Sequence, residues 1–179
     1  MNQTELLNNL LSFRFAAIYD IFAQVCLHET IKKADKGEFN LEEIETILPE
    51  GKINFQTFLN QLNTMAPNAA VETKRNANRF LTRNLLKEGF RLTQSYCQEN
   101  GRESEFTSES WYQFARIVVN CLSHSFTFSF RPYDLTKLPV SYNGVTIDSS
   151  NDGNELSMKL EVLLSLFDEI ISFVKNKLT

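Results

Sequence analysis

Three polar side chains recur at four-residue steps within a stretch of the chain that is otherwise almost entirely apolar. The stretch is ARIVVNCLSHSFTF, residues 115–128, and the polar side chains are those of Arg116, Asn120 and His124. Burying an unpaired polar group costs on the order of several kcal/mol, so these side chains must find partners or face a wet cleft. Histidine titrates near neutrality, and arginine binds phosphate through paired hydrogen bonds. The three residues, with Tyr112 two turns before Asn120, are therefore candidates for a functional site.

A structural interpretation of the same residues stays open. Arg116 would then form a salt bridge with an acidic residue elsewhere, and His124 would cap the C-terminus of its helix, where a positive charge favours the helix dipole. The rest of the helix is typical of a core element, with apolar residues at Trp111, Ala115, Val118 and Leu122 and, further round, at Ile117, Val119 and Cys121. Such a helix is expected at the centre of a fold or in an interface.

A second pattern is a row of basic residues on a predicted long helix. Their positions follow at steps of four and are Arg75, Arg79, Arg83, Lys87 and Arg91. Each step rotates the side chain by ~40°, so only about three of the five share one direction. The row is interpreted either as a solvated helix face or as a short strip that binds RNA or another anion.

Other chemistries find little support in the sequence. Cys26 with His28 and Cys121 with His124 suggest a zinc site, but their spacings do not follow finger or ribbon patterns. A nucleophilic Cys121 would need a cationic setting, and its neighbours are apolar. There is no glycine-rich phosphate loop. We therefore expect neither a metal nor a cofactor.

Periodicity indicates the elements that must position these residues. Helices are predicted over 4–33, 41–48, 53–65, 71–98, 109–125 and from 156 onward, with a linker at residues 98–106. The first helix is expected to pack over a broad inward face that holds Leu7, Leu11, Phe15, Ile18, Phe22 and Val25 and is widened by Leu6, Leu10, Phe13, Ala17 and Ile21. Thr107 or Ser108 is the expected cap of the 109–125 helix, and Gly89 is expected to allow a close helix crossing.

A change to alternating periodicity begins after His124. Phe126, Phe128 and Phe130 alternate with polar residues, and Asn143-Gly144 is a strong hairpin signal. The sequence therefore predicts a mainly α, single-domain chain over 1–179, with a small β-hairpin insertion near residues 126–148.

Composition limits the classes of function. The chain has 179 residues and a net charge of −4, which argues against a dedicated nucleic-acid binder but leaves room for a local basic patch. No stretch resembles a secretion signal or a membrane span. The three cysteines are an odd number, which favours free, buried thiols in a reducing cytoplasm.

The run NCLSH, followed by aromatic residues and a hairpin and preceded by a long amphipathic helix, resembles the HEPN superfamily of prokaryotic helical-bundle proteins. The family pattern Arg-Asn-x-x-x-His would lie on residues 119–124, where Asn120 and His124 match and position 119 is Val. The resemblance implies an antiparallel helical bundle, commonly dimeric, in which active members cleave RNA without a metal. In that chemistry His acts in proton transfer and Arg stabilises charge on the phosphorane, while Asn orients the neighbouring groups or holds the phosphate.

Val119 decides how the resemblance is interpreted, because valine supplies neither a charge nor a hydrogen bond. We expect a catalytically degenerate HEPN-like module that binds or regulates an RNA or protein partner in a defence or toxin–antitoxin setting. The alternative is an active metal-independent endoribonuclease in which Arg116 replaces the missing arginine and acts with Asn120 and His124. A homodimer is expected through the helix 109–125 or its flanks.

Overall fold

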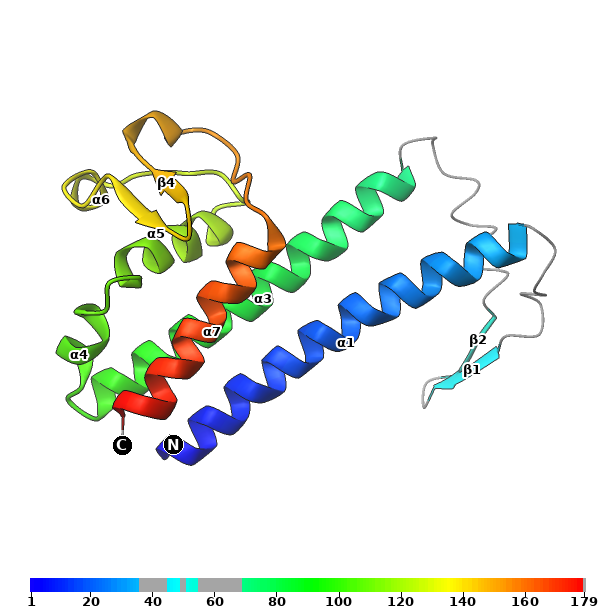
Figure 1. Ribbon diagram of the computed structural model, residues 1–179, viewed down its shortest axis with the longest axis horizontal. Coiled ribbons are helices and arrows are strands. Elements are labelled where there is room, and N and C mark those ends of the chain that lie inside the picture. Colours follow the sequence, from blue (N-terminus) through cyan, green and yellow to red (C-terminus); the bar gives the residue numbers. More distant parts are fainter. Residues whose placement is uncertain (36–44, 49–50, 55–68, 179) are drawn as a thin grey trace. The chain divides into compact units, whose positions relative to one another are not determined.

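The computed structural model describes residues 1–35, 45–48, 51–54 and 69–178, and these are mainly helical (Figure 1). In chain order the elements are α1 (Gln3–Asp35), β1 (Glu45–Leu48), β2 (Gly51–Asn54), α3 (Ala69–Glu99), α4 (Glu103–Thr107), α5 (Tyr112–Ser123), α6 (Pro132–Leu135), β3 (Val140–Tyr142), β4 (Val145–Ile147), η2 (Ser149–Asn151) and α7 (Leu160–Lys177). The predicted mainly α fold with a small β-hairpin is confirmed. No helix among these residues is both long and apolar enough to cross a membrane.

The chain divides into two compact units. The first consists of Met1–Ala16 and Phe80–Thr179, and the second of Ala17–Arg79. The helices α1 and α3 contribute residues to both units. The first unit holds the polar residues of α5 and is the one that positions the candidate site.

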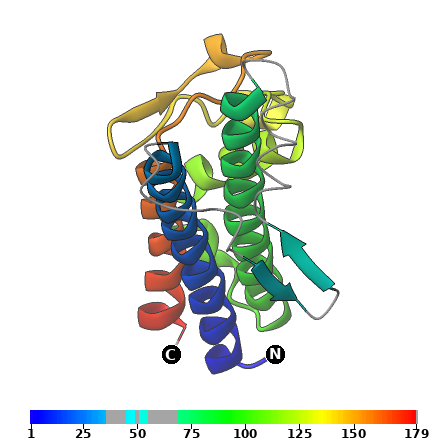
Figure 2. The same cartoon turned by 90° about the vertical axis from the view of Figure 1, so that its right-hand side faces the viewer.

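In the first unit, α3 and α7 lie side by side, as both ribbon views show (Figures 1 and 2). Gly89 of α3 faces the ring of Phe167 of α7, and a Cβ atom at position 89 would overlap that ring. The Phe167 side chain is fully buried. The predicted role of Gly89 in a close helix crossing is confirmed, because any larger side chain would push the two helices apart.

The start of α1 closes the same unit. Leu6 and Leu10 are fully buried, and the side-chain amide of Gln3 donates to the backbone oxygen of Val174 at 2.9 Å. Gln3 and Val174 lie near the two ends of the chain, which Figure 2 shows at the same end of this unit. The two termini of the bundle are therefore held together.

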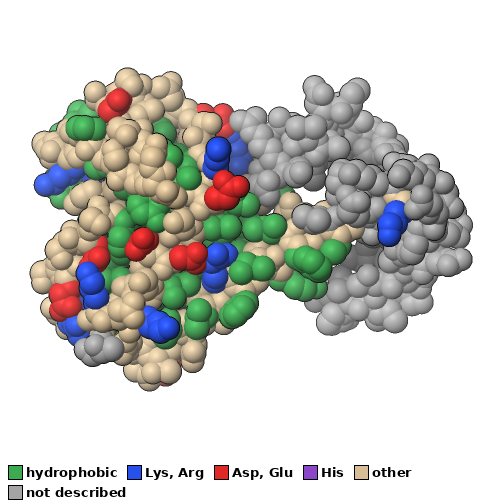
Figure 3. All heavy atoms as spheres, viewed as in Figure 1, with side chains coloured by type: hydrophobic (Ala, Val, Ile, Leu, Met, Phe, Trp, Pro, Cys, Tyr) green, Lys and Arg blue, Asp and Glu red, His purple; other side chains and the backbone are tan. Residues whose placement is uncertain are grey.

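The predicted inward face of α1 is too broad. Leu6, Leu10 and Ala17 are buried, whereas Phe15, Ile18, Tyr19 and Phe22 are exposed. Hydrophobic side chains accordingly appear along α1 in the space-filling view (Figure 3). The helix is apolar round much of its circumference, so its sequence alone does not select which stripe packs.

An aromatic cluster links α3, α4, α5 and α7. Phe106 of α4 is fully buried, with its ring centroid 5.2 Å from that of Phe90, 5.1 Å from that of Tyr112 and 5.3 Å from that of Phe173. This packing explains why residues 103–107 form a helix where the sequence suggested a linker. The predicted cap at Thr107 or Ser108 is wrong, because α5 begins only at Tyr112, after Trp111 and without a side-chain cap.

The helix α5 is covered within the chain itself. Its buried residues are Tyr112, Phe114, Ala115, Ile117, Val118, Val119, Cys121 and Leu122. The hairpin contributes to this cover, since Tyr142 lies 5.5 Å from the Phe114 ring and shares a 2.9 Å hydrogen bond with Ser165 of α7. The apolar surface of α5 is therefore no reason to expect a homodimer through this helix.

The hairpin lies where the sequence placed it. Val140 pairs with Ile147 and Tyr142 with Val145, and the connecting Asn143 and Gly144 both have positive φ, 46° and 77°. Two such residues in succession match the turn that best fits the twist of a hairpin. The alternating residues 126–130 do not form a strand: only Thr127 makes an isolated bridge, to Glu155, because the chain turns sharply after α5.

The short helix predicted over 41–48 is wrong for its described part. Glu45–Leu48 is a strand that pairs antiparallel with Gly51–Asn54. The β-branched residues Thr46, Ile47 and Ile53 suit such a ladder. Residues 41–44, and all but the first two residues of the helix predicted over 53–65, lie outside the described residues.

Candidate anion-binding site

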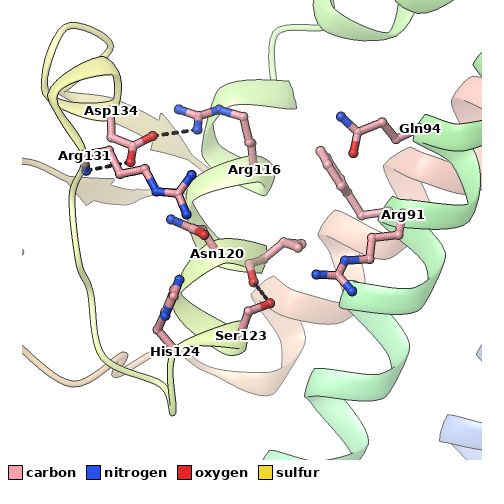
Figure 4. Close-up of a pocket in the computed structure, with 10 residues that line it drawn as sticks. Arg91, Gln94, Arg116, Asn120, Ser123, His124, Arg131 and Asp134 are labelled. Atoms are coloured by element: carbon pink, nitrogen blue, oxygen red, sulfur yellow. Dashed lines mark hydrogen bonds and ion pairs between the residues drawn. The ribbon is translucent and has the colours of Figure 1, made fainter. Parts of the chain in front are cut away.

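Arg116, Asn120 and His124, which form the polar row of α5, line a pocket of about 360 Å³ in the first unit. Its walls come from α3, from α5 and from the segment that leads into α6 (Figure 4). The lining residues are Phe90, Arg91, Gln94, Arg116, Val119, Asn120, Ser123, His124, Arg131 and Asp134. The three polar residues predicted from their spacing are therefore brought together on one wall.

The two interpretations of Arg116 prove compatible. Its Nη1 donates to Oδ1 of Asp134 at 2.6 Å, and its Nε donates to Oε1 of Gln113 at 3.0 Å, so the predicted salt bridge is confirmed. Only 2% of the Asp134 side chain is exposed, against 22% for Arg116. The guanidinium group is thus held in place while it still lines the pocket.

Asp134 holds both the Arg116 side chain and the start of α6 in place. Its other carboxylate oxygen, Oδ2, accepts the backbone N–H of Arg131 at 2.8 Å, at the start of α6. One buried carboxylate therefore connects α6 to α5. Removing it would leave both a helix start and a largely buried guanidinium without their acceptor.

A donor of Arg116 remains unsatisfied. Within the described part of the chain, its Nη2 is buried and has no hydrogen-bond partner. A buried charged donor without an acceptor is costly, and such groups are found where a site completes its hydrogen bonds with a ligand.

His124 is exposed and occupies the C-cap position of α5. Its backbone N–H donates to the carbonyl oxygens of Asn120 and Cys121, at 3.1 and 3.0 Å. The imidazole lies at the open end of the polar row, one turn beyond Asn120 (Figure 4). It is therefore accessible to solvent and to a bound group.

The charges of the pocket favour an anion. Arg91 enters from α3, Arg116 from α5 and Arg131 from the start of α6, and among the described residues of the lining only Asp134 is acidic. Figure 4 shows the Arg131 guanidinium directed toward Asn120 and that of Arg91 directed from the facing wall toward Ser123. An excess of two positive charges is thus concentrated in a chain whose net charge is −4. Guanidinium groups from different walls suit phosphate or carboxylate oxygens.

Sequence reasoning missed Arg131, Gln94, Ser123 and Asp134. Arg131-Pro-Tyr-Asp carries a local signal, because Pro at the first helical position followed by an acidic residue is typical of a helix start. That signal predicts α6 but not its position beside α5. The contact between Asp134 and Arg116 depends on tertiary packing across 18 residues of sequence.

The predicted basic strip does not act as one surface at this pocket. Arg91 lines it, whereas Arg83 and Lys87 are half-buried and are not in its lining. Arg79 belongs to the second unit, and the side chain of Arg75 lies outside the described residues. The rotation of successive four-residue steps accounts for the separation of Arg91 from the others.

Tyr112 lies in the core and not among the residues that line the pocket. Its ring stacks on that of Phe90 at 5.6 Å, and burial raises the pKa of its hydroxyl. Its contribution to the site is therefore to support Phe90, which does line the pocket.

The thiols have no role in this site. Burial raises the pKa of Cys97 to about 11 and that of Cys121 to about 12, so both are protonated near neutrality. The prediction of buried thiols holds for these two and is wrong for Cys26, which is exposed. Among the described residues, no three His, Cys, Asp or Glu side chains are grouped to hold a metal ion.

Comparisons of this chain with protein-family models, with curated proteins and with solved structures found no match.

Proposed function

We propose that the chain is a HEPN-like module that binds single-stranded RNA through this pocket and has little or no nuclease activity. The observation that supports it is the convergence of three arginines from three segments on one pocket that also holds Asn120 and His124. Phosphate is the anion that RNA presents at every nucleotide, and charge-assisted hydrogen bonds from arginine bind it strongly.

The side chains argue for binding without efficient cleavage. Val119 lines the pocket but is only 7% exposed and offers no hydrogen bond, so the motif position supplies no charge. Arg116 is held by Asp134, which neutralises part of its charge before any substrate binds. A preorganised cation aimed at the developing charge is what phosphoryl chemistry requires.

An active metal-independent endoribonuclease is the second candidate function. It is favoured by the position of Arg116, Asn120 and His124 along one pocket wall, where His124 is free to transfer a proton. In this alternative the 2′-hydroxyl loses its proton and attacks the adjacent phosphate, and Arg116 stabilises the phosphorane. The bond from phosphorus to the 5′-oxygen then breaks, which leaves a 2′,3′-cyclic phosphate and a protonated 5′-hydroxyl, with His124 acting in the proton transfer.

The two functions differ in the fate of the RNA. A 5′-labelled single-stranded RNA incubated with the protein and a chelator is expected to be bound and recovered intact, because Val119 leaves the motif incomplete. Val119→Arg is expected to raise any cleavage, and His124→Ala to remove it. Gel analysis of the products, with a test for 2′,3′-cyclic phosphate ends, measures this.

The melting transition of each variant serves as the control for folding, since position 119 is buried. Robust wild-type cleavage that is lost only in His124→Ala would favour the endoribonuclease. RNA that is neither bound nor cleaved by the wild type and by folded Val119→Arg would contradict both candidates.

The proposal extends to the setting and the partners. A degenerate RNA-binding module would regulate a partner, either an RNA or a protein, in a defence or toxin–antitoxin setting in the cytoplasm. No step of this proposal uses a metal or a cofactor.

We also propose that the chain forms a homodimer, through α1 and not through α5. Phe15, Ile18, Tyr19 and Phe22 are exposed at positions i, i+3, i+4 and i+7, so they share one face of the helix. Light scattering is expected to give a mass near twice 20.6 kDa for the wild type, and a lower mass for Phe15→Ser combined with Phe22→Ser. A wild type that stays at 20.6 kDa at tens of micromolar would exclude the homodimer.

A further inference from the structure

The short helix α6 presents an aromatic side chain to solvent beside the pocket. Tyr133 is 57% exposed, although its neighbour Asp134 is almost completely buried. The backbone of α6 is held at both ends, by the Arg131 N–H bond to Asp134 and by the Thr136 hydroxyl, which donates to the carbonyl oxygen of Tyr133 at 2.8 Å. The Tyr133 ring therefore extends from a turn whose backbone is held in place by hydrogen bonds.

Arg116 connects this ring to the pocket. Its Cζ lies 5.0 Å from the centroid of the Tyr133 ring, within the range of a cation–π interaction, and the same guanidinium lines the pocket. Arg116 is itself fixed by Gln113 and Asp134. The anion pocket and the exposed ring are therefore adjacent parts of one surface.

A second cation lies at the same ring. The Nζ of Lys137 is 5.4 Å from the Tyr133 centroid, and the Lys137 side chain is exposed. Aromatic rings interleaved with basic side chains are what proteins use to bind single-stranded nucleic acids, because each base has a face to stack and each nucleotide has a phosphate.

We infer that Tyr133 is a stacking subsite for a base of single-stranded RNA whose phosphate lies in the pocket. The exposed Lys137 side chain would leave the ring to the base and move beside the neighbouring phosphate. This inference rests on the proposed function and adds a contact to an RNA base, whereas the pocket itself binds the phosphate. A ring held in place loses little conformational freedom on binding. Stacking tolerates any base, so we expect weak sequence preference.

The test compares Tyr133→Leu with Tyr133→Phe. Two fluorescent probes are titrated: a single-stranded RNA and an abasic ribose-phosphate oligomer of the same length. Loss of one stacked base is expected to weaken the binding of the RNA by about 5- to 150-fold in Tyr133→Leu, whereas Tyr133→Phe keeps wild-type affinity. All three proteins should bind the abasic oligomer equally.

Phe80→Leu provides a matched control, because Phe80 is an exposed aromatic residue of α3 that does not line the pocket. It is expected to bind both probes as the wild type does. If Tyr133→Leu binds the RNA as tightly as the wild type while Arg131→Gln does not, the stacking subsite is wrong and the RNA pocket stands. If Tyr133→Leu weakens both probes equally, the residue is structural. If the wild type binds neither probe, the proposed function itself fails.

Discussion

Replacing Arg91 and Arg131 together with glutamine is expected to weaken the binding of single-stranded RNA by about a hundredfold or more. The two guanidinium groups enter the pocket from different segments, α3 and the start of α6, so each would contact a bound phosphate from its own side. A hydrogen bond to a charged group contributes about 1.5–3 kcal/mol, and each 1.4 kcal/mol changes affinity tenfold. Fluorescence anisotropy titrations of a labelled RNA measure the change.

The salt dependence adds a second readout. Each neutralised phosphate of a single strand contributes about 0.7 to the slope of log K against log salt, and the two arginines share one phosphate, so the double variant should lower that slope by about 0.7. Both arginines are exposed, and we expect the thermal unfolding transition to be unchanged.

A matched control removes two positive charges elsewhere. Lys159→Gln with Lys175→Gln changes exposed lysines that do not line the pocket. This variant isolates the effect of net charge from the effect of position. Equal losses of affinity in the two double variants would mean that RNA binding is a property of overall charge, which would contradict the pocket.

The sequence was sufficient for features encoded by a few neighbouring residues. The Asn143-Gly144 turn requires two residues with positive φ, and Gly89 is the position where α3 and α7 approach closely, so each has a local physical cause. The polar row of α5 was also readable, because a four-residue spacing places side chains along one helix face.

Features that depend on tertiary packing could not be predicted from the sequence. The stripe of α1 that packs is chosen by its neighbours, since the helix is apolar on several sides and, among its described side chains, only Leu6, Leu10 and Ala17 are buried. The linker after α3 becomes the helix α4 because Phe106 completes an aromatic cluster. Side-chain spacing carries no information about either choice.

The same limit applies to the candidate site. Arg116, Asn120 and His124 were identified from one helix, but the charge of the pocket depends equally on Arg91 and Arg131. Arg91 belonged to a basic row with two possible interpretations, and only its position opposite α5 separates it from that row. Arg131 follows α5 in the sequence and lies beside it again where Asp134 binds Arg116.

Asp134→Asn is expected to destabilise the protein and yet to tighten RNA binding. Asparagine has nearly the same shape and keeps an oxygen for the Arg131 N–H, but it removes the charge that balances Arg116. Breaking a buried pair from one side costs about 3–5 kcal/mol, and the partial exposure of Arg116 reduces this to about 2–4 kcal/mol. Urea unfolding measures the loss.

The expected gain in RNA affinity follows from the loss of the negative charge of Asp134. Asp134 is the one carboxylate in the pocket lining, and it repels any phosphate that binds there. At an effective dielectric constant near 20, its removal is worth on the order of 1–2 kcal/mol, or about 5- to 30-fold in affinity.

Asp168→Asn is the control. Asp168 pairs with Arg14 at 2.7 Å, and 51% of its side chain is exposed. The free energy of unfolding should therefore change by less than about 1 kcal/mol, and RNA binding should not change. A folded Asp134→Asn protein that binds RNA more weakly than the wild type would show that Asp134 orients the arginines and that its charge does not limit binding.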